Sequence, residues 1–296
     1  MSKIILKAAV IGDPISHSLS PKLHNFWLEK YKISGSYEAL QVKAEDLESN
    51  VKWLIQEGYS GFNVTIPHKE KIFQLINKQG GELTRSAFAA KAVNTVVIKE
   101  NGALYGHNSD CEGFLNNLKS AHPNIDFKGK SAFIIGAGGA ARAIIHGLFE
   151  DAKVQNIFVT NRTKDKFDLI YSELYEQRKD YRKLFNTNLK FLDKNSFQEN
   201  LSNCDLLINS TSLGMINQHS LQLDLKNLQK SAIVYDIVYK PLMTELLKNA
   251  EKQGNKIVTG IGMLAFQAAI GFESWFHHKA EINNKLLEFL IKQSKD

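Results

Sequence analysis

A glycine-rich turn in the middle of the chain carries residue types suited to binding a dinucleotide. Gly136, Gly138 and Ala141 of GAGGAARA match the pattern G-x-G-x-x-G/A, directly after an apolar strand expected over 131–135 and at the start of an Ala-rich helix. Glycines permit a tight turn and bring the backbone close to a pyrophosphate, and a helix N-terminus supplies unpaired N–H groups. A turn used only for packing is the alternative, but this context favours a nucleotide site.

The residues after the next expected strand, 157–160, indicate which dinucleotide binds. An NAD site usually ends this strand with Asp or Glu, which binds the ribose 2′-hydroxyl. In this chain the strand is followed by polar and basic residues: Asn161, Arg162, Thr163, Lys164 and Lys166. A guanidinium at this place would pair with a 2′-phosphate and stack against the adenine. The pattern therefore favours NADP.

The first half of the chain places polar side chains where a fold alone would not require them. Ser18 and Ser20 stand in a loop beside an expected helix N-terminus, which suits an anionic oxygen. Asn63 and Thr65 share one face of the strand in GFNVTIPHK. The same half also carries Lys69 in IPHK, Asn94 in AVNTV and Asp110 in GHNSD. Each of them, taken alone, is better explained as a helix cap or a surface residue.

Strands and helices alternate along the whole chain, which predicts an α/β protein. Helices are expected to begin at Ser20-Pro21, with the Ser20 hydroxyl as N-cap, and at Pro67 and Asp110, and Asn101-Gly102 predicts a β-hairpin. A new series of buried strands starts after the loop 121–124, so we place the domain boundary near residues 115–125. Their βαβ rhythm predicts a parallel sheet covered on both faces.

Composition excludes several classes of protein. The 296 residues are 43% hydrophobic and 23% charged, which is typical of a globular chain. The two cysteines, Cys111 and Cys204, lie far apart, which excludes a disulfide framework and predicts a reduced, cytoplasmic chain. The most apolar run, 132–141, is well short of the ~20 residues that a bilayer requires. The net charge of +6 is mild, and segment 162–200 interleaves both signs, so we expect neither a membrane nor a nucleic acid as partner.

Nine ordered blocks of the sequence resemble the shikimate dehydrogenase family over nearly the whole chain. The blocks are GDPISHSLSPKLHN, GFNVTIPHK, AVNTV, GHNSDCEGF, GAGGAARA, NRT, NSTSLGM, DIVYKPLMT and GIGMLAFQAAIGFESW. The resemblance implies an α/β, two-domain fold: an N-terminal α/β substrate domain (1–118) completed by C-terminal helices (260–296), and a Rossmann-like NADP-binding domain (119–259). It also implies reversible, NADPH-linked reduction of 3-dehydroshikimate to shikimate in chorismate and aromatic amino acid biosynthesis.

The resemblance also implies roles for individual residues. Lys69 and Asp110 would be the catalytic pair. The substrate contacts would be Ser18, Ser20, Asn63, Thr65, Asn94, Tyr239 and Gln267. The cofactor contacts would be Gly136, Ala137, Gly138, Gly139, Ala140, Asn161, Arg162, Thr163, Lys166, Ile237 and Gly260. No metal site is expected, because the histidines near these motifs lack metal-ligand spacing.

The chain departs from the usual family pattern in two places. The family more often has Tyr-Asn-Thr-Asp where this chain has His107-Asn108-Ser109-Asp110, and it commonly has Gly where Lys91 stands. Ser109 keeps a hydroxyl, so we expect little loss there. Lys91 adds a charge near Asn94.

Two alternatives remain beside this reading. One is a quinate/shikimate dehydrogenase of broader scope that uses NAD or NADP; the basic cluster at Arg162 and Lys166 favours the NADP-specific enzyme. The other is a non-catalytic paralogue that binds shikimate-like acids and regulates; the presence of Lys69 and Asp110 and the complete glycine turn argue against it. The expected partner is the small-molecule substrate, and hydrophobic pattern alone does not separate a monomer from a homodimer.

Overall fold

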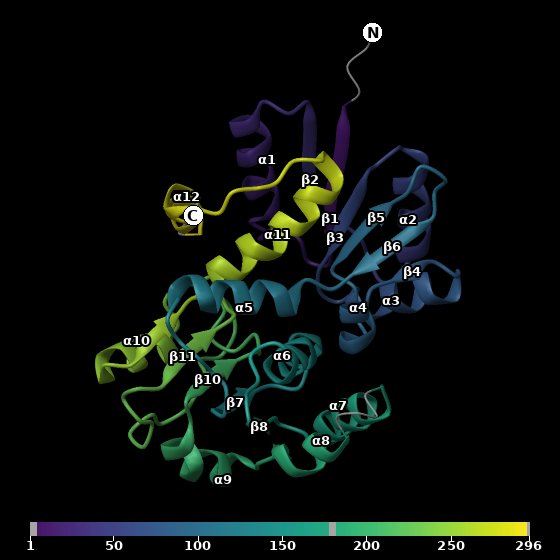
Figure 1. Ribbon diagram of the computed structural model, residues 1–296. Helices are drawn as coiled ribbons and strands as arrows, with labels where there is room; N and C mark the ends of the chain where they lie inside the picture. The colour runs from purple at the N-terminus through teal and green to yellow at the C-terminus, as the bar shows by residue number, and fades with distance from the viewer. Residues whose placement is uncertain (1–4, 178–181, 295–296) are drawn as a thin grey trace. The chain divides into compact units, whose positions relative to one another are not determined.

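The computed structural model describes residues 5–177 and 182–294, and the chain divides into two compact units (Figure 1). Unit 1 contains the described residues up to Gly113 together with Leu264–Gln293, and unit 2 contains Phe114–Met263. Each unit is built around its own six-stranded sheet. No helix in the described part of the chain is long and apolar enough to cross a bilayer.

The sheet of unit 1 is mixed. Its strands run in the order β2-β1-β3-β5-β6-β4, with bounds β1 Leu6–Gly12, β2 Gly35–Gln41, β3 Gly61–Val64, β4 Glu82–Leu83, β5 Thr95–Ile98 and β6 Leu104–His107. Strand β1 pairs in parallel with β2 and β3, whereas β5 is antiparallel to both β3 and β6. The β5–β6 hairpin confirms the turn expected at Asn101-Gly102, and because the two strands of a hairpin are antiparallel the sheet of this unit is mixed.

Helices cover both faces of this sheet (Figure 1). Their bounds are α1 Ser20–Tyr31, α2 Leu47–Gln56, α3 Lys69–Lys78, α4 Arg85–Ala90, α11 Gly260–Phe276, which enters this unit at Leu264, and α12 Asn284–Gln293. On one face α2 and α3 pack their apolar sides on β1 and β3 around Leu54, Ile72 and Phe62. On the other, α11 sits so close to β3 that a Cβ on Gly61 would lie 2.1 Å from Nε1 of Trp275. Glycine is therefore required at residue 61.

The start of α1 differs from the expectation. Leu19, not Ser20, is the N-cap, and no side chain caps the helix. Pro21 stands in the first turn, where its missing N–H costs nothing, because those groups have no intrahelical partner. The Ser20 hydroxyl is therefore left for contacts outside the helix.

The sheet of unit 2 is entirely parallel, as its βαβ rhythm predicts. The order is β12-β11-β10-β7-β8-β9, with bounds β7 Ser131–Ile135, β8 Asn156–Thr160, β9 Leu189–Phe191, β10 Leu206–Asn209, β11 Ile233–Asp236 and β12 Lys256–Val258. Numbered within the unit, this is the order 3-2-1-4-5-6 of doubly wound dinucleotide-binding folds, in which ligands lie outside the carboxyl ends of the strands where the order reverses. Here that point lies between β7 and β10.

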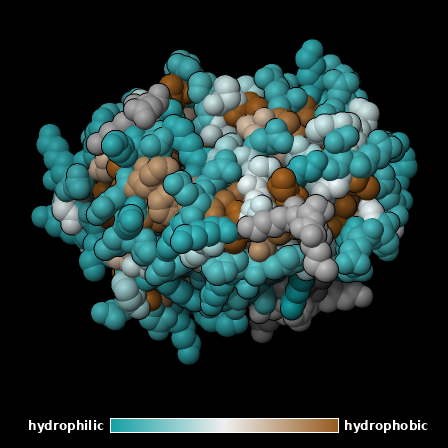
Figure 2. All heavy atoms as spheres, turned by 90° about the horizontal axis from the view of Figure 1, so that it is seen from above, coloured by the Kyte–Doolittle hydropathy of each residue, from teal (hydrophilic) through white to brown (hydrophobic). Residues whose placement is uncertain are grey.

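Buried apolar residues from strands and helices form the core of unit 2. The helices are α5 Asp110–Ala121, which enters this unit at Phe114, α6 Gly139–Glu150, α7 Lys164–Gln177, α8 Arg182–Asn188, α9 Lys194–Glu199 and α10 Glu245–Gln253. Phe133, Leu207 and Val234 lie in a core cluster with Phe197 and Leu247. The molecular face in Figure 2 is mainly hydrophilic, with its apolar residues in small separate groups. This surface is typical of a protein whose apolar side chains are mostly inside.

The units divide within two helices, a few residues from the expected boundaries at 118 and 260. In α5 the division follows Gly113, because Phe114 stacks on Tyr235 with ring centroids 4.5 Å apart. Asn117 donates hydrogen bonds to the Tyr235 hydroxyl (2.6 Å) and to the carbonyl of Thr259 (2.9 Å). Helical periodicity does not reveal which neighbour each residue of a continuous helix packs against, so sequence alone could not place these divisions.

Candidate active site

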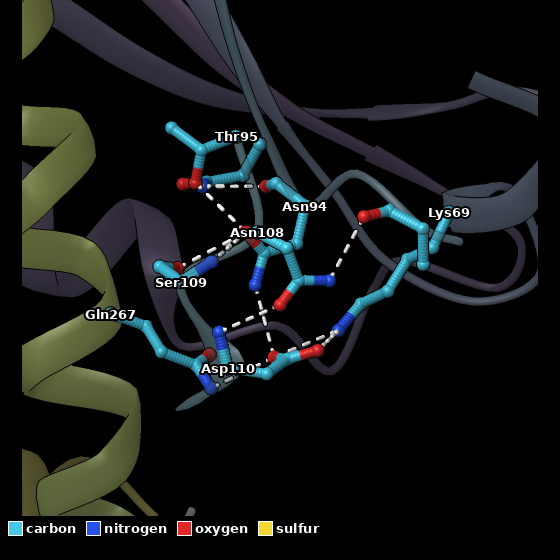
Figure 3. A network of polar contacts seen from close by, with 9 residues as sticks. Lys69, Asn94, Thr95, Asn108, Ser109, Asp110 and Gln267 are labelled. Atoms are coloured by element: carbon cyan, nitrogen blue, oxygen red, sulfur yellow. Dashed lines mark hydrogen bonds and ion pairs between the residues drawn. The ribbon is translucent and has the colours of Figure 1, made fainter. Parts of the chain in front are cut away.

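A buried ion pair joins the two residues expected to be catalytic. Lys69 is the first residue of α3, and Asp110 is the first residue of α5. The Lys69 Nζ atom lies 3.0 Å from Oδ1 and 2.9 Å from Oδ2 of Asp110 (Figure 3). The Asp110 side chain is 3% exposed and that of Lys69 is 24% exposed. The Asp110 carboxylate thus binds the Lys69 ammonium group, and part of the Lys69 side chain remains exposed to solvent.

The Asp110 carboxylate is held by three donors that lie far apart in the sequence. Besides Lys69, Nδ2 of Asn94 and Nε2 of Gln267 each donate to Oδ1 at 2.9 Å (Figure 3). Gln267 lies on α11, 157 residues after Asp110 in the sequence. The backbone N–H of Asp110 donates to Oδ1 of Asn108 at 3.0 Å, so Asn108 supplies the acceptor at the start of α5. A buried carboxylate needs such compensation, because an unpaired charge in the interior is costly.

Asn94 uses both ends of its amide to join the loops of the site. Its Oδ1 accepts from the Ser109 backbone N–H at 3.0 Å, from the Ser109 hydroxyl at 3.1 Å and from the Thr95 hydroxyl at 3.0 Å. Its Nδ2 donates to Asp110. Ser109, where the family more often has Thr, thus donates its hydroxyl proton to Asn94. Thr95 was not singled out from the sequence, although it follows Asn94 directly.

Asn63 extends this network along β3. Its Nδ2 donates to the carbonyl oxygen of Asn94 at 2.9 Å and to the Thr95 hydroxyl at 3.2 Å. Its Oδ1 accepts from the Tyr37 hydroxyl at 2.7 Å. Lys69, Asp110, Asn94, Asn63 and Gln267, all expected from the sequence, thus belong to one hydrogen-bonded network within unit 1.

The remaining residues expected at the substrate lie as follows. The backbone N–H of Ser20 donates to the Ser18 hydroxyl at 3.3 Å, so the two serines are neighbours at the start of α1. Thr65 follows β3 and is half-buried, and its methyl group would lie 2.4 Å from a Cβ on Gly12. Tyr239 follows β11 in unit 2, where burial raises the pKa of its hydroxyl.

Lys91 does not join the network. It caps the C-terminus of α4 in the left-handed conformation, with φ of 49°. This conformation explains why glycine is common there, since glycine adopts it without strain. The Lys91 Nζ atom lies 5.7 Å from the ring centroid of Phe73, which places the added charge on an aromatic face.

The glycine turn of unit 2 has the geometry of a nucleotide cradle. Gly136 follows β7 with φ of +110°, and a Cβ there would lie 2.7 Å from both Oγ of Ser210 and Cγ2 of Thr211. Gly138 is the N-cap of α6, and a Cβ there would meet nothing within 4 Å. Ala137, Gly139 and Ala140 complete the turn and the first helical residues. The turn lies beside the point where the strand order reverses and presents the N–H groups of α6 to an anion.

Basic side chains stand at the end of β8, as expected for a 2′-phosphate site. Arg162, Thr163 and Lys166 are exposed, and Nδ2 of Asn161 ties this bend by donating to the carbonyl of Thr163 at 2.9 Å. Lys164 pairs with Asp168 at 2.7 Å. Among the described residues no carboxylate lies within 4.0 Å of the Arg162 or Lys166 side chain.

Ile237 and Gly260, expected at the cofactor, are in direct contact. A Cβ on Gly260 would lie 2.2 Å from the carbonyl oxygen of Ile237, so only glycine fits. Buried Asp236 shapes this segment by accepting from Thr244 Oγ1 at 2.7 Å and from Asn209 Nδ2 at 3.0 Å. Burial raises the pKa of Asp236, and these hydrogen bonds oppose the rise. Within the described residues, no group of three or more His, Cys, Asp or Glu side chains is placed to hold a metal ion.

Comparisons with known proteins identify the family. Two family models match the chain: the shikimate dehydrogenase substrate binding domain over residues 10–96 and shikimate / quinate 5-dehydrogenase over residues 118–241. The shikimate dehydrogenase (NADP(+)) of Paramagnetospirillum magneticum is 40% identical over 284 residues, 96% of this chain and 97% of the relative.

Solved structures agree with that result. The shikimate 5-dehydrogenase of Thermus thermophilus, in complex with NADP(H) and shikimate, matches with a TM-score of 0.82 and 31% identity, covering 98% of this chain and 100% of the other. The enzyme of Listeria monocytogenes, in complex with shikimate and NAD, matches with a TM-score of 0.81 and 31% identity, covering 97% and 96%. The chain therefore belongs to the shikimate dehydrogenase family.

Proposed function

We propose that the protein is an NADP-dependent oxidoreductase that interconverts 3-dehydroshikimate and shikimate in chorismate and aromatic amino acid biosynthesis. Lys69 and Asp110 are its catalytic pair. The observation that carries this assignment is the bidentate contact of the two side chains, at 3.0 and 2.9 Å, inside a network of residues expected to bind the substrate. Relatives named shikimate dehydrogenase (NADP(+)) support the activity and the cofactor.

Lys69 carries the proton of the reaction. When bound, NADPH supplies a hydride to the ketone carbon, and the carbonyl oxygen then needs a proton. The Lys69 ammonium donates that proton in the biosynthetic direction, and the amine accepts it in reverse. Asp110 holds Nζ through both carboxylate oxygens, so the proton-bearing group is oriented before the substrate arrives.

The polar side chains of unit 1 match the chemistry of the substrate. Shikimate has one carboxylate and three hydroxyls, so its site needs many hydrogen-bonding groups. Ser18 and Ser20 hold the carboxylate near the N-terminus of α1. The hydroxyls are bound by Asn63, Thr65, Asn94 and Gln267. Tyr239, a residue of unit 2, is proposed as a further substrate contact. A group left unpaired in the bound state costs about 1–3 kcal/mol, which gives the set its selectivity.

The residues of unit 2 fit a dinucleotide with a 2′-phosphate. The turn Gly136–Ala140 holds the pyrophosphate against the N-terminus of α6, where a side chain on Gly136 would be excluded. Arg162 and Lys166 bind the 2′-phosphate, with Asn161 and Thr163 shaping the bend. Ile237 and Gly260 are the remaining cofactor contacts.

Steady-state rates test this assignment. Purified protein is assayed with shikimate or quinate, each with NADP or NAD, by following reduction of the nicotinamide. We expect rapid turnover only with shikimate and NADP. Comparable rates with quinate or NAD would instead indicate a broad-specificity dehydrogenase. Binding without turnover in every combination would indicate a regulatory paralogue and would contradict the catalytic role of Lys69.

We propose further that unit 1 is the substrate-binding domain and unit 2 the NADP-binding domain. The protein acts in the cytoplasm, where Cys111 and Cys204, both buried thiols, remain reduced. It works as a monomer or a homodimer, which light scattering coupled to size-exclusion chromatography distinguishes.

A further inference from the structure

Tyr37 is fixed by its surroundings so that its hydroxyl points at the substrate residues. It lies on β2 and is 3% exposed. Its ring stacks on that of His24, with centroids 3.9 Å apart and planes 5° from parallel. Asn25 clamps its backbone, since Nδ2 donates to the Tyr37 carbonyl at 2.8 Å and Oδ1 accepts from the Tyr37 N–H at 3.2 Å. The stacking of the ring and the hydrogen bonds of the backbone together fix the direction in which the Tyr37 hydroxyl points.

The Tyr37 hydroxyl acts as a hydrogen-bond donor to Asn63. Burial raises the pKa of this hydroxyl well above its usual value, and a hydrogen bond with the Ser20 side chain opposes the rise. The group is therefore protonated at any physiological pH. Its proton points to Oδ1 of Asn63 at 2.7 Å, which identifies that atom as the amide oxygen.

Asn63 can then offer a ligand only one kind of hydrogen bond. Its two amide protons are used by the carbonyl of Asn94 and the hydroxyl of Thr95. Its Oδ1 has two lone pairs, of which Tyr37 occupies one. A flipped amide would set Oδ1 against the Asn94 carbonyl oxygen, which repels it. The remaining lone pair of Oδ1 can accept a further hydrogen bond, and the Asn63 residue as a whole is half-buried.

The hydrogen bonds beyond Asn63 all run in the same direction. Asn63 donates to Thr95, Thr95 donates to Oδ1 of Asn94 at 3.0 Å, and Asn94 donates to Asp110 at 2.9 Å. Donors and acceptors that alternate in this way polarise one another. The orientation of Asn63 is thus coupled to the catalytic carboxylate.

We propose that Tyr37 is a positioning residue that sets the Asn63 amide to accept a hydroxyl proton from the substrate. Tyr37 thereby selects ligands that carry an O–H group at that place. This inference rests on the proposed function, because it assumes that Asn63 faces the substrate. Tyr37 then contributes to substrate selection through Asn63 and without touching the substrate itself.

The substitution Tyr37→Phe tests the role, because it removes one oxygen and keeps the ring that stacks on His24. We expect the KM for shikimate to rise about tenfold, as for loss of one hydrogen bond to a buried group. The kcat and the KM for NADP should change much less. Tyr59→Phe is the matched control: Tyr59 is a buried tyrosine of unit 1 whose hydroxyl donates to Glu38, away from the network. It should leave all three constants unchanged.

A double-mutant cycle shows whether Tyr37 acts through Asn63. In an Asn63→Ala background, Tyr37→Phe should add less than about a twofold further change, because residues that act as a unit are not additive. An unchanged KM for shikimate in Tyr37→Phe, or an equal effect in both backgrounds, would overturn the inference. Equal thermal midpoints of Tyr37→Phe and Tyr59→Phe exclude a general loss of stability.

If the wild-type protein does not turn over shikimate, the proposed function is wrong, but the positioning role of Tyr37 can still be tested. The same four variants are then titrated with shikimate by calorimetry. A Kd about tenfold weaker in Tyr37→Phe, accompanied by weaker binding in Asn63→Ala and unchanged binding in Tyr59→Phe, would still support the positioning role, and equal Kd values would end it.

Discussion

The two units hold their functional residues by different means. In unit 1 side chains hold one another, since Lys69, Asn94 and Gln267 all donate to the carboxylate of Asp110. In unit 2 the backbone shapes the site through Gly136 and Gly260, where a Cβ would clash with its neighbours, and the basic side chains are exposed. A substitution in the network of unit 1 therefore removes hydrogen bonds from several neighbouring side chains. In unit 2, a substitution in the glycine turn tests steric effects, and a substitution of a basic residue tests electrostatic effects, so the two can be separated.

The largest effect is expected from breaking the ion pair of unit 1. Lys69→Ala should lower kcat roughly 10²–10⁴-fold, because it removes the group that donates and accepts the proton. The KM for shikimate should change far less, since Asn94 and Gln267 still hold Asp110. Initial rates at saturating shikimate and NADP measure both constants.

Lys91→Gln is the control for that change. Lys91 lies near the site but contacts Phe73 and not the network, so the kcat of the Lys91→Gln protein should equal that of the wild type. A Lys69→Ala protein with altered KM and unchanged kcat would show that Lys69 binds the substrate and takes no part in proton transfer.

A smaller and selective effect is expected at the exposed basic residues of unit 2. Arg162→Ala should lower kcat/KM for NADP about 10- to 100-fold, because it removes charge-assisted hydrogen bonds to the 2′-phosphate. The rate with NAD and the thermal midpoint should stay the same. Lys164→Ala is the matched control, since that ammonium is paired with Asp168. Equal losses with NADP and NAD would contradict a 2′-phosphate role for Arg162.

The glycine turn separates backbone strain from ligand contact. Gly136→Ala should destabilise the protein without cofactor by about 1–3 kcal/mol, because φ is +110° and its Cβ would clash with Ser210 and Thr211. Gly138→Ala should not destabilise it, since φ is −101° and the space is open. Urea unfolding of both variants measures the difference. Equal stabilities would show that the turn adjusts to a side chain.

The smallest effect concerns a buried histidine of unit 1. Burial lowers the pKa of His24 to about 3, while an unfolded histidine titrates near 6.5. Between these values the unfolded chain binds more protons, so stability falls as the pH drops below 6.5. His24→Phe should lessen the loss of unfolding free energy between pH 7 and pH 5 by about 1–2 kcal/mol. Parallel pH profiles of variant and wild type would show that His24 is not the group responsible.

How much of the molecule the sequence predicts also differs between the units. In unit 2 apolar strands and a glycine turn give strong local signals, and the parallel sheet was correctly expected. In unit 1 the strand β2 was missed, because GSYEALQ contains a single fully buried residue, Tyr37, and weak strand formers. Tyr37 was therefore missed as well, although it contacts Asn63.

The residues of the active site were expected, but their contacts were not. The resemblance to the family pointed to Lys69, Asp110, Asn94 and Gln267. That three of them converge on the carboxylate of Asp110 follows only from the packing of α3, α11 and the loop before β5 around the start of α5. Thr95 and Asn108 have no distinguishing spacing, because a hydroxyl or amide beside a motif residue is common in any loop.

The lengths of the outer strands bear on how the protein behaves when it is concentrated. Unpaired strand edges allow sheets of different molecules to join, and short edge strands oppose this. In the described chain three of the four sheet edges are strands of two or three residues, namely β4, β9 and β12. The fourth, β2, has seven residues and exposes Ser36, Glu38 and Gln41. Aggregation by sheet extension is therefore confined to one polar strand, the same strand that carries Tyr37.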